Sequence, residues 1–252
     1  MPASLTGKVV IVTGASAGIG EGVALGAATA GAKVVVVARS ADKLDALVKQ
    51  INEAGGEATS YVGDVGLEST AKGMVEKALS TFGALHAAFL NAGYYGKAPI
   101  TELDVDMIDT VLNVNVKSVI LGIKHCLPAM KETSGGTGSI IVNSSTMASA
   151  VTTGLGSAPA IYAASKAAAS MIMKYAAVEA APDVRVNAIG PGVIKTAMTD
   201  FIPSEEMENL HLLKRAGRVD EVVPLVTYLA SDESSLVTGS EMIIDAGWAI
   251  QA

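Results

Sequence analysis

Short apolar runs alternate along the chain with longer stretches in which apolar residues recur at helical spacing. The first run, residues 9–13, ends in a glycine-rich turn, and the second, residues 33–37, is almost entirely valine. Strands that are apolar on both faces are typical of a parallel sheet covered by helices on both sides. Repeated strand–helix alternation also requires right-handed crossovers. The sequence therefore predicts an α/β fold with a doubly wound parallel sheet and helices on both faces.

The alternation shows no linker, internal repeat or low-complexity segment, so residues 1–252 are predicted to form a single domain. The predicted strands are residues 9–13, 33–37, 58–62, 84–90, 139–143, 184–189 and 241–245. The predicted helices are residues 18–30, 41–54, 67–82, 104–131, 160–180 and 220–229. Residues 134–138 and 152–159 are predicted to be loose loops, and residues 196–213 are predicted to form a lid over a substrate site.

Composition narrows the class of protein. Half of the residues are hydrophobic and 17% are charged, which indicates a large core and favours a buried contact between subunits. The net charge of -7 argues against non-specific nucleic-acid binding, and no apolar stretch reaches the roughly 20 residues that span a bilayer. Cys126 is the single cysteine, which suits a reducing compartment. Because the first residues also lack a signal-peptide pattern, we expect a cytoplasmic protein.

Residues 13–20 read Thr-Gly-Ala-Ser-Ala-Gly-Ile-Gly and join the first predicted strand to the first predicted helix. Glycines permit a tight turn and let the backbone approach a pyrophosphate, whose charge the helix N-terminus favours. The spacing Gly-x3-Gly-x-Gly differs from the standard dinucleotide fingerprint. Its position between an apolar strand and a helix is nevertheless the one that such a site requires, so the turn predicts a dinucleotide site.

The end of the second predicted strand indicates which dinucleotide binds. Proteins that bind NAD usually place a carboxylate there for the ribose 2′-hydroxyl, whereas an arginine can accommodate a 2′-phosphate. Here Arg39 and Ser40 follow the strand, and the arginine offers a planar fork of donors suited to phosphate. Asp42 weakens the local positive field. The sequence predicts a preference for NADP(H), with NAD(H) as the alternative.

Tyr162 and Lys166 are four residues apart and therefore share one face of a predicted helix. A phenol has a pKa near 10 and is a poor base at neutral pH. A nearby ammonium favours the phenolate, so we expect Lys166 to bring the pKa of Tyr162 toward the working range. Ser144 and Ser145 end a predicted strand, where an open α/β sheet places its ligand crevice, and a serine hydroxyl there can bond a substrate oxygen.

Taken together, these motifs resemble the short-chain dehydrogenase/reductase family, and the resemblance covers essentially the whole chain. The motifs that carry it are Thr13-Gly14-x3-Gly18-x-Gly20, Gly63-Asp64-Val65, Asn91-Ala92-Gly93, Asn115, Ser144-Ser145, Tyr162-x3-Lys166, Asn187 and Pro191-Gly192-Val193-Ile194-x-Thr196. The resemblance implies a single Rossmann-like domain with about seven strands. It also implies an oxidoreductase that uses a nicotinamide cofactor, and a homotetramer or dimer.

The resemblance further implies roles for individual residues. Tyr162 is the expected acid/base, and Ser145 is expected to hold the substrate oxygen. Lys166 is expected to bond the nicotinamide ribose, and Asn115 to position a water for a proton relay through it. The residues expected to contact the cofactor are Gly14, Ser16, Gly18, Ile19, Gly20, Arg39, Ser40, Asp64, Val65, Asn91, Ala92, Gly93, Tyr162, Lys166, Pro191, Gly192, Ile194 and Thr196.

Some positions depart from the family pattern. Ala17 stands where NADP(H)-using members often have a basic residue, which weakens that cofactor prediction, whereas Leu90 and His86 are interpreted as structural variation. Ser145 lies seventeen residues before Tyr162 instead of the common thirteen. Ser149 has the common spacing and is the alternative, although the strand context favours Ser145.

The function that this pattern predicts is reduction of a ketone or aldehyde to an alcohol, or the reverse reaction. An apolar lid predicts hydrophobic or small neutral substrates, and its apolar residues are Phe201, Ile202, Met207, Leu210, Leu212 and Leu213. The alternatives are a 3-oxoacyl-acyl-carrier-protein reductase and a non-catalytic nucleotide-binding protein on the same fold.

Several further side chains bear on the site. Tyr94 and Tyr95 are candidates to line the substrate pocket, and Trp248 is expected beside a pocket or a subunit contact. The three histidines have no metal-ligand spacing, so we expect no metal site. Among them, His211 lies in the predicted lid and is expected to be exposed.

Overall fold

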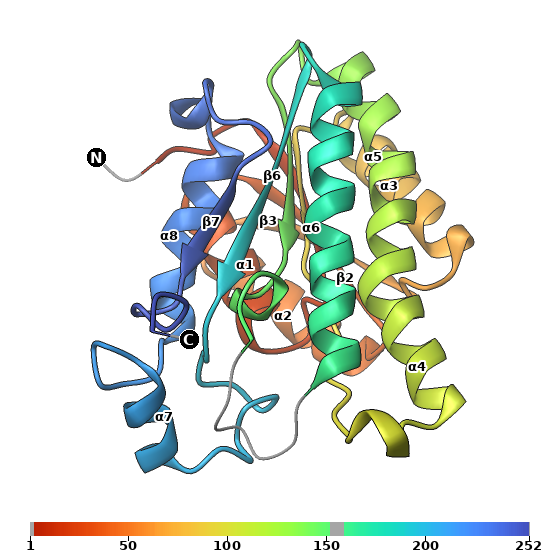
Figure 1. Ribbon diagram of the computed structural model, residues 1–252. Helices are drawn as coiled ribbons and strands as arrows, with labels where there is room; N and C mark the ends of the chain where they lie inside the picture. The colour runs from red at the N-terminus through yellow and green to blue at the C-terminus, as the bar shows by residue number, and fades with distance from the viewer. Residues whose placement is uncertain (1–2, 152–158, 252) are drawn as a thin grey trace.

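The computed structural model describes residues 3–151 and 159–251, with a seven-stranded parallel sheet at its centre (Figure 1). The strands are β1 (Val9–Thr13), β2 (Lys33–Ala38), β3 (Glu57–Val62), β4 (Ala87–Leu90), β5 (Gly138–Asn143), β6 (Val184–Pro191) and β7 (Glu241–Ile244). Their order is β3-β2-β1-β4-β5-β6-β7. The prediction of a doubly wound parallel sheet is confirmed. Of the predicted loop at residues 152–159, residues 152–158 lie outside the described residues.

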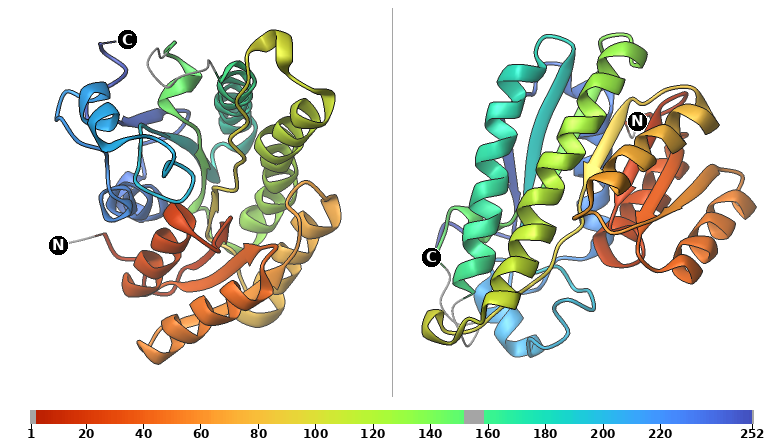
Figure 2. Two further views of the ribbon diagram at one scale, coloured as in Figure 1. Left: turned by 90° about the horizontal axis from the view of Figure 1, so that it is seen from below. Right: turned by 90° about the vertical axis from the view of Figure 1, so that its right-hand side faces the viewer.

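Helices cover both faces of the sheet (Figures 1 and 2). They are α1 (Gly18–Thr29), α2 (Ala41–Glu53), α3 (Glu68–Phe82), α4 (Val105–Leu112), α5 (Ser118–Thr133), α6 (Ala160–Ala180), α7 (Ser204–Leu210) and α8 (Val219–Ala230). On one face α3, α5 and α6 form a core that includes Met74 and Met173. On the other face α1, α2 and α8 form a second core that includes Leu44 and Val226. No helix in the described ranges is both long and apolar enough to cross a membrane.

The sheet reverses its winding direction between β1 and β4, which lie side by side at its centre. In open α/β sheets, ligands bind beyond the carboxyl ends of the strands at such a switch point. Here the ends of the two strands are tied together, because the backbone N–H of Asn91 donates to the Thr13 hydroxyl at 2.9 Å. The Asn91 side-chain amide donates to the Thr13 carbonyl, also at 2.9 Å. The topology therefore places a rigid crevice beside the glycine-rich turn.

One predicted helix, residues 104–131, is helical from Val105 to Thr133 in the structure but is not a regular α-helix throughout. The structure divides it into α4 and α5 with a π-helical turn, Asn113–Lys117, between them. Such turns interrupt the regular ladder and are frequent at functional sites. The turn holds Asn115 with its side chain buried against backbone outside the helix, which sequence periodicity does not reveal. The segment predicted as a lid contains α7, which lies beyond the carboxyl ends of the strands (Figure 1).

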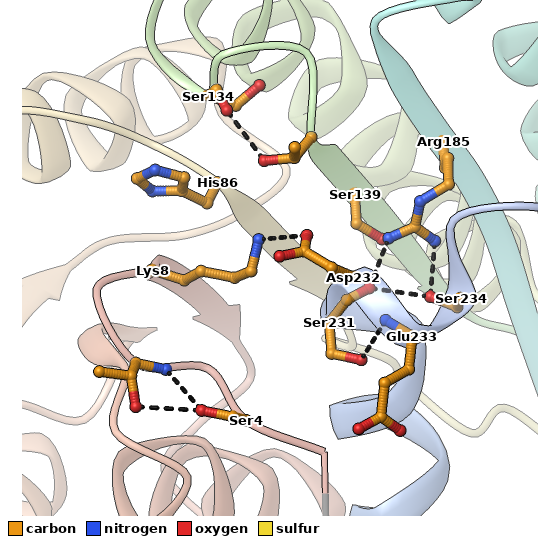
Figure 3. A network of polar contacts seen from close by, with 12 residues as sticks. Ser4, Lys8, His86, Ser134, Ser139, Arg185, Ser231, Asp232, Glu233 and Ser234 are labelled. Carbon is orange, nitrogen blue, oxygen red and sulfur yellow. Dashed lines mark hydrogen bonds and ion pairs between the residues drawn. The ribbon is translucent and has the colours of Figure 1, made fainter.

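Polar contacts join the segments at the amino-terminal ends of the strands, on the side of the sheet away from the crevice (Figure 3). Arg185, near the start of β6, donates to the Ser234 hydroxyl at 2.8 Å and to two carbonyls at the end of α8 at 3.0 Å. Lys8 pairs with Asp232 at 2.7 Å. His86 accepts the backbone N–H at the start of β1 at 3.0 Å, in keeping with its interpretation as structural variation. These contacts lie at the strand ends that are remote from the crevice, so they stabilise the scaffold rather than the site.

Candidate active site

A long groove lies along the carboxyl ends of the strands, and the segments that follow β1, β2, β3, β4 and β5 line it. The predicted cofactor residues in its lining are Gly14, Ser16, Gly18, Ile19, Arg39, Ser40, Asp64, Val65, Asn91, Ala92, Gly93, Tyr162, Lys166 and Thr196. Three other predicted cofactor residues line an adjoining apolar pocket, and they are Pro191, Gly192 and Ile194. The sheet thus gathers residues that are far apart in the sequence along one edge.

The glycines of the first turn leave bare backbone in the groove. Gly14 has a φ of 65°, and a Cβ atom there would lie 2.9 Å from the Cα atom of Ala92. Gly20 lines no part of the groove, but a Cβ atom on it would collide with the Gly14 carbonyl oxygen. Because no side chain shields them, the N–H groups at the start of α1 can approach a pyrophosphate closely. This cradle fits a dinucleotide.

Arg39 leaves the end of β2 at the far end of the groove. Its side chain is exposed, and no carboxylate of the described residues lies within 4.0 Å of its guanidinium. Asp42, which is also exposed, therefore does not pair with it. The guanidinium keeps its fork of donors available for a phosphate group.

Tyr162 and Lys166 lie one turn apart near the start of α6. Tyr162 lines both the groove and the apolar pocket, so the two cavities meet at its side chain. Lys166 is only 3% exposed, and its ammonium donates to the Asn143 carbonyl at 2.6 Å. The Lys166 Nζ atom lies 5.7 Å from the centroid of the Tyr162 ring.

Burial dominates the protonation of this pair. It raises the pKa of Tyr162 to about 12, against a smaller opposing effect of the Ser145 hydroxyl, and it lowers the pKa of Lys166 to about 8. For Tyr162 the direction is opposite to the one expected from the sequence, because desolvation of the phenolate is the largest effect on its pKa. At neutral pH the phenol therefore holds its proton and Lys166 remains cationic.

Asn115 is 1% exposed and lines neither cavity. Its Oδ1 atom accepts from the backbone N–H of Tyr94 at 2.8 Å, and its Nδ2 atom donates to the Tyr94 carbonyl at 3.0 Å and to the Ser165 hydroxyl at 2.9 Å. A Cβ atom on Gly93 would lie 3.5 Å from the Lys166 Nζ atom and 3.7 Å from the Asn115 Oδ1 atom. The side chain therefore fixes the loop after β4 against α6, beside the lysine.

The empty space in the apolar pocket is about 650 Å³ when the part open to solvent is counted. Its apolar lining includes Met147, Ile194, Phe201, Ile202 and Trp248. A few polar groups interrupt this lining, above all the serine and tyrosine hydroxyls. Such a cavity suits a small, mostly apolar molecule whose oxygen reaches those hydroxyls.

The structure distinguishes the two candidate serines. Ser145 is buried, lines the apolar pocket together with Tyr162, and its hydroxyl acts to lower the pKa of that phenol. Its oxygen also accepts the backbone N–H of Met147 at 3.2 Å, which caps the short turn Thr146–Ala148. Ser149 is exposed and lines neither cavity. The geometry therefore favours Ser145 in spite of its unusual spacing from Tyr162.

The segment 196–213 contributes unevenly to the pocket. Phe201 and Ile202 line it, whereas Leu212 and Leu213 are exposed and line neither cavity. The expectation that His211 is exposed is wrong, since it is 1% exposed. Its ring packs against Trp248 with centroids 5.7 Å apart, and its Nδ1 atom bonds the Met207 carbonyl at 2.6 Å.

Asn143 is a site residue that the sequence reading did not assign. It lines both cavities, and its amide donates to the Asn91 side chain at 2.8 Å. Its position at the carboxyl end of β5 is the signal that could have identified it. Of the two candidate tyrosines, Tyr95 lines the apolar pocket and Tyr94 lines the groove. No three His, Cys, Asp or Glu side chains of residues 3–151 and 159–251 converge as metal ligands.

Comparisons with known proteins agree with this geometry. A family model described as "Enoyl-(Acyl carrier protein) reductase" matches residues 14–249. The chain is 35% identical over 243 residues to a cyclohexanol dehydrogenase from Acinetobacter, covering 96% of this chain and 94% of that one. It is 36% identical over 252 residues to a 3-oxoacyl-acyl-carrier-protein reductase from Thermotoga maritima, covering 98% and 99%. A short chain dehydrogenase from Burkholderia cenocepacia, solved in complex with NADP, superposes with a TM-score of 0.90 at 29% identity over 97% and 98% of the two chains.

Proposed function

Because this chain belongs to the short-chain dehydrogenase/reductase family, we propose that it reduces ketones or aldehydes with NADPH, using Tyr162 as the acid/base. The observation that carries the proposal is the position of Tyr162 at the junction of the two cavities. A dinucleotide in the groove and a carbonyl compound in the pocket would meet there. Initial rates with NADPH and NADH against a panel of ketones and aldehydes test the proposal, and no turnover in either direction would refute it.

A nicotinamide cofactor held by the groove residues would supply the hydride for the carbonyl carbon, or would accept it in alcohol oxidation. In the reduction, Tyr162 donates its phenolic proton to the carbonyl oxygen while Ser145 hydrogen-bonds that oxygen. Since burial raises the pKa of Tyr162 to about 12, the free phenol is a weak acid, and charge on its oxygen must be stabilised as the proton leaves.

Lys166 provides that stabilisation in the proposed mechanism. Although burial lowers its pKa to about 8, it is still an ammonium at neutral pH and favours the developing phenolate. The family resemblance adds that Lys166 bonds the nicotinamide ribose and that Asn115 positions a water for a proton relay. The contacts of Asn115 with the loop after β4 and with α6 support a positioning role beside the lysine.

The preference for NADPH rests on Arg39. Its guanidinium is exposed at the end of the groove where the adenosine ribose is expected, and a 2′-phosphate would give it a charge-assisted partner. Similarity to a dehydrogenase solved with NADP supports this choice. Ala17 supplies no second cation beside it, so the preference depends on a single side chain.

We expect Arg39→Ala to lower kcat/KM for NADPH by about 10- to 100-fold, because a hydrogen bond to a charged group contributes about 1.5–3 kcal/mol. The value for NADH should hardly change, since NADH has no 2′-phosphate. Lys49→Ala is the matched control, because it removes one positive charge from an exposed position on α2 outside the groove. Equal losses with both cofactors would show that Arg39 does not read the 2′-phosphate.

A 3-oxoacyl-acyl-carrier-protein reductase is the second candidate function, favoured by 36% identity to such an enzyme over the whole chain. Both candidates use the same chemistry and differ in the substrate. Comparing kcat/KM for a 3-oxoacyl group on the carrier protein with that for a free ketone decides between them. The non-catalytic alternative is disfavoured, because a protein that only binds a nucleotide has no need for Tyr162, Lys166 and Ser145 to converge.

We also propose that the protein is a homotetramer or dimer in the cytoplasm. One side of α6 exposes an apolar stripe, with Met171 52%, Tyr175 68% and Val178 78% exposed, and this spacing follows one helix face. Light scattering on the purified protein should give more than one chain, and Val178→Glu should shift it toward the monomer. A monomeric wild-type protein would refute the assembly. Cys126 is fully buried and free, in keeping with a reducing compartment.

A further inference from the structure

We propose that the hydroxyl of Tyr95 is a second recognition point in the apolar pocket, which hydrogen-bonds a substrate oxygen other than the reacting carbonyl oxygen. The preferred substrates are then ketones that carry an additional hydroxyl or carbonyl group, rather than plain hydrocarbon ketones. This inference rests on the proposed function, because it assumes that the apolar pocket receives the carbonyl compound.

The Tyr95 hydroxyl is buried and has no hydrogen-bond partner among the described residues. A buried polar group without a partner is unfavourable, and most such groups in proteins are satisfied. Tyr95 also lines the apolar pocket, so a molecule bound there can supply the missing partner. Burial raises the pKa of Tyr95, and the neutral phenol can act as donor or acceptor.

The ring of Tyr95 is held between two other aromatic rings. It meets the Tyr162 ring edge-on with centroids 4.9 Å apart, and it stacks on the Phe201 ring at 5.7 Å. The Lys97 Nζ atom lies 3.9 Å from the centroid of the Phe201 ring on the outer side of this group, and such contacts are attractive. A ring fixed in this way presents its hydroxyl at a defined place, as a recognition group must.

Several other hydroxyls of the pocket already have tasks. Ser145 and Tyr162 face the reacting oxygen in the proposed mechanism. The Thr199 hydroxyl donates within its own loop, to the carbonyls of Ile194 and Thr196 at 2.8 and 2.9 Å. The Tyr95 hydroxyl is buried without such a partner. Because the Tyr95 ring lies beside Tyr162, a second oxygen bonded to this hydroxyl would be within reach of a small substrate.

The experiment compares cyclohexanone with its 2-, 3- and 4-hydroxy derivatives in the wild-type protein and in Tyr95→Phe. The substitution removes only the hydroxyl and keeps the ring between Tyr162 and Phe201. We expect the wild type to prefer at least one hydroxyketone over cyclohexanone by about 5- to 150-fold in kcat/KM, which corresponds to the cost of an unpaired buried group. In Tyr95→Phe that preference should disappear, so that the ratio of kcat/KM between the hydroxyketone and cyclohexanone falls toward one.

Binding provides a second readout that does not need turnover. Trp248 is the single tryptophan and lines the pocket, so its fluorescence can report dissociation constants for the same ketones. No turnover with clear binding preferences would refute the proposed function and leave the role of Tyr95 intact. The inference fails if the wild type binds no hydroxyketone more tightly than cyclohexanone, or if Tyr95→Phe keeps the preference.

Tyr228→Phe is the matched control, because it removes a tyrosine hydroxyl on α8 outside both cavities. It should leave the ratio between hydroxyketone and cyclohexanone unchanged. The unfolding temperature of Tyr95→Phe distinguishes a role of the hydroxyl in substrate recognition from a role in the fold. Removal of a hydroxyl that has no partner in the protein should not lower this temperature. A lower unfolding temperature in Tyr95→Phe would show that its hydroxyl has a partner inside the protein and would overturn the inference.

Discussion

Tyr162→Phe is expected to lower kcat for ketone reduction by about 10²- to 10⁴-fold, the usual contribution of a positioned acid or base. The substitution removes the proton donor and keeps the ring against Tyr95, whose centroid is 4.9 Å away. Because the cradle of bare backbone at Gly14 is untouched, NADPH should bind almost as tightly as before. Absorbance of the reduced nicotinamide measures turnover, and its fluorescence on titration measures binding.

The matched control for this experiment is again Tyr228→Phe, which should retain wild-type turnover. A Tyr162→Phe protein that keeps full activity would remove Tyr162 from the mechanism. A protein that loses cofactor binding along with activity would instead place the phenol among the groups that hold the dinucleotide. Only loss of turnover with binding retained supports the acid/base role.

The layered sheet could be predicted because its strands are apolar on both faces and its connections are helical. An apolar run such as residues 33–37 is buried on both sides only in a sheet that has helices on both faces. In the structure, β2 is buried from Val34 to Ala38. The groove could be predicted because glycines at a strand-to-helix turn allow the backbone to approach a pyrophosphate closely, and such a turn can be recognised from the local sequence. These features depend on neighbours in the sequence.

Other features depend on contacts between distant segments, and the sequence could not reveal them. In the π-helical turn between α4 and α5, Asn115 bonds Tyr94 and Ser165. His211 is buried because Trp248 packs against it from the far end of the chain. The pKa of Tyr162 rises because the surrounding segments desolvate its phenol, and the spacing from Lys166 gives no information about that burial.

The choice between the two serines shows how spacing and topology can disagree. Spacing alone favoured Ser149, which is exposed, whereas the end of β5 favoured Ser145, which is buried in the pocket. Parallel strands bring their carboxyl ends to one edge regardless of loop length, so extra residues in the loop before α6 change the spacing without moving the strand end. Topology is therefore the better guide at this position.

Ser145→Ala is expected to lower kcat by about 10²- to 10³-fold, as removal of one donor to a developing oxyanion does in acyl-transfer enzymes. In the proposed mechanism the hydroxyl bonds the carbonyl oxygen and also lowers the pKa of Tyr162, so both charge stabilisation and proton transfer weaken. Ser149→Ala is the matched control, since it removes the same atom from an exposed residue four positions later.

The Ser145 oxygen also caps the turn Thr146–Ala148, so Ser145→Ala should cost about 1 kcal/mol in the free energy of unfolding. Turnover must therefore be measured well below the unfolding midpoint of the variant, with NADPH binding checked in parallel. The expected result is a folded protein that binds NADPH normally and turns over slowly, beside a fully active Ser149→Ala. If Ser149→Ala is the impaired variant instead, the substrate oxygen lies farther along the loop, and the apolar pocket beside Tyr162 is not where the carbonyl reacts.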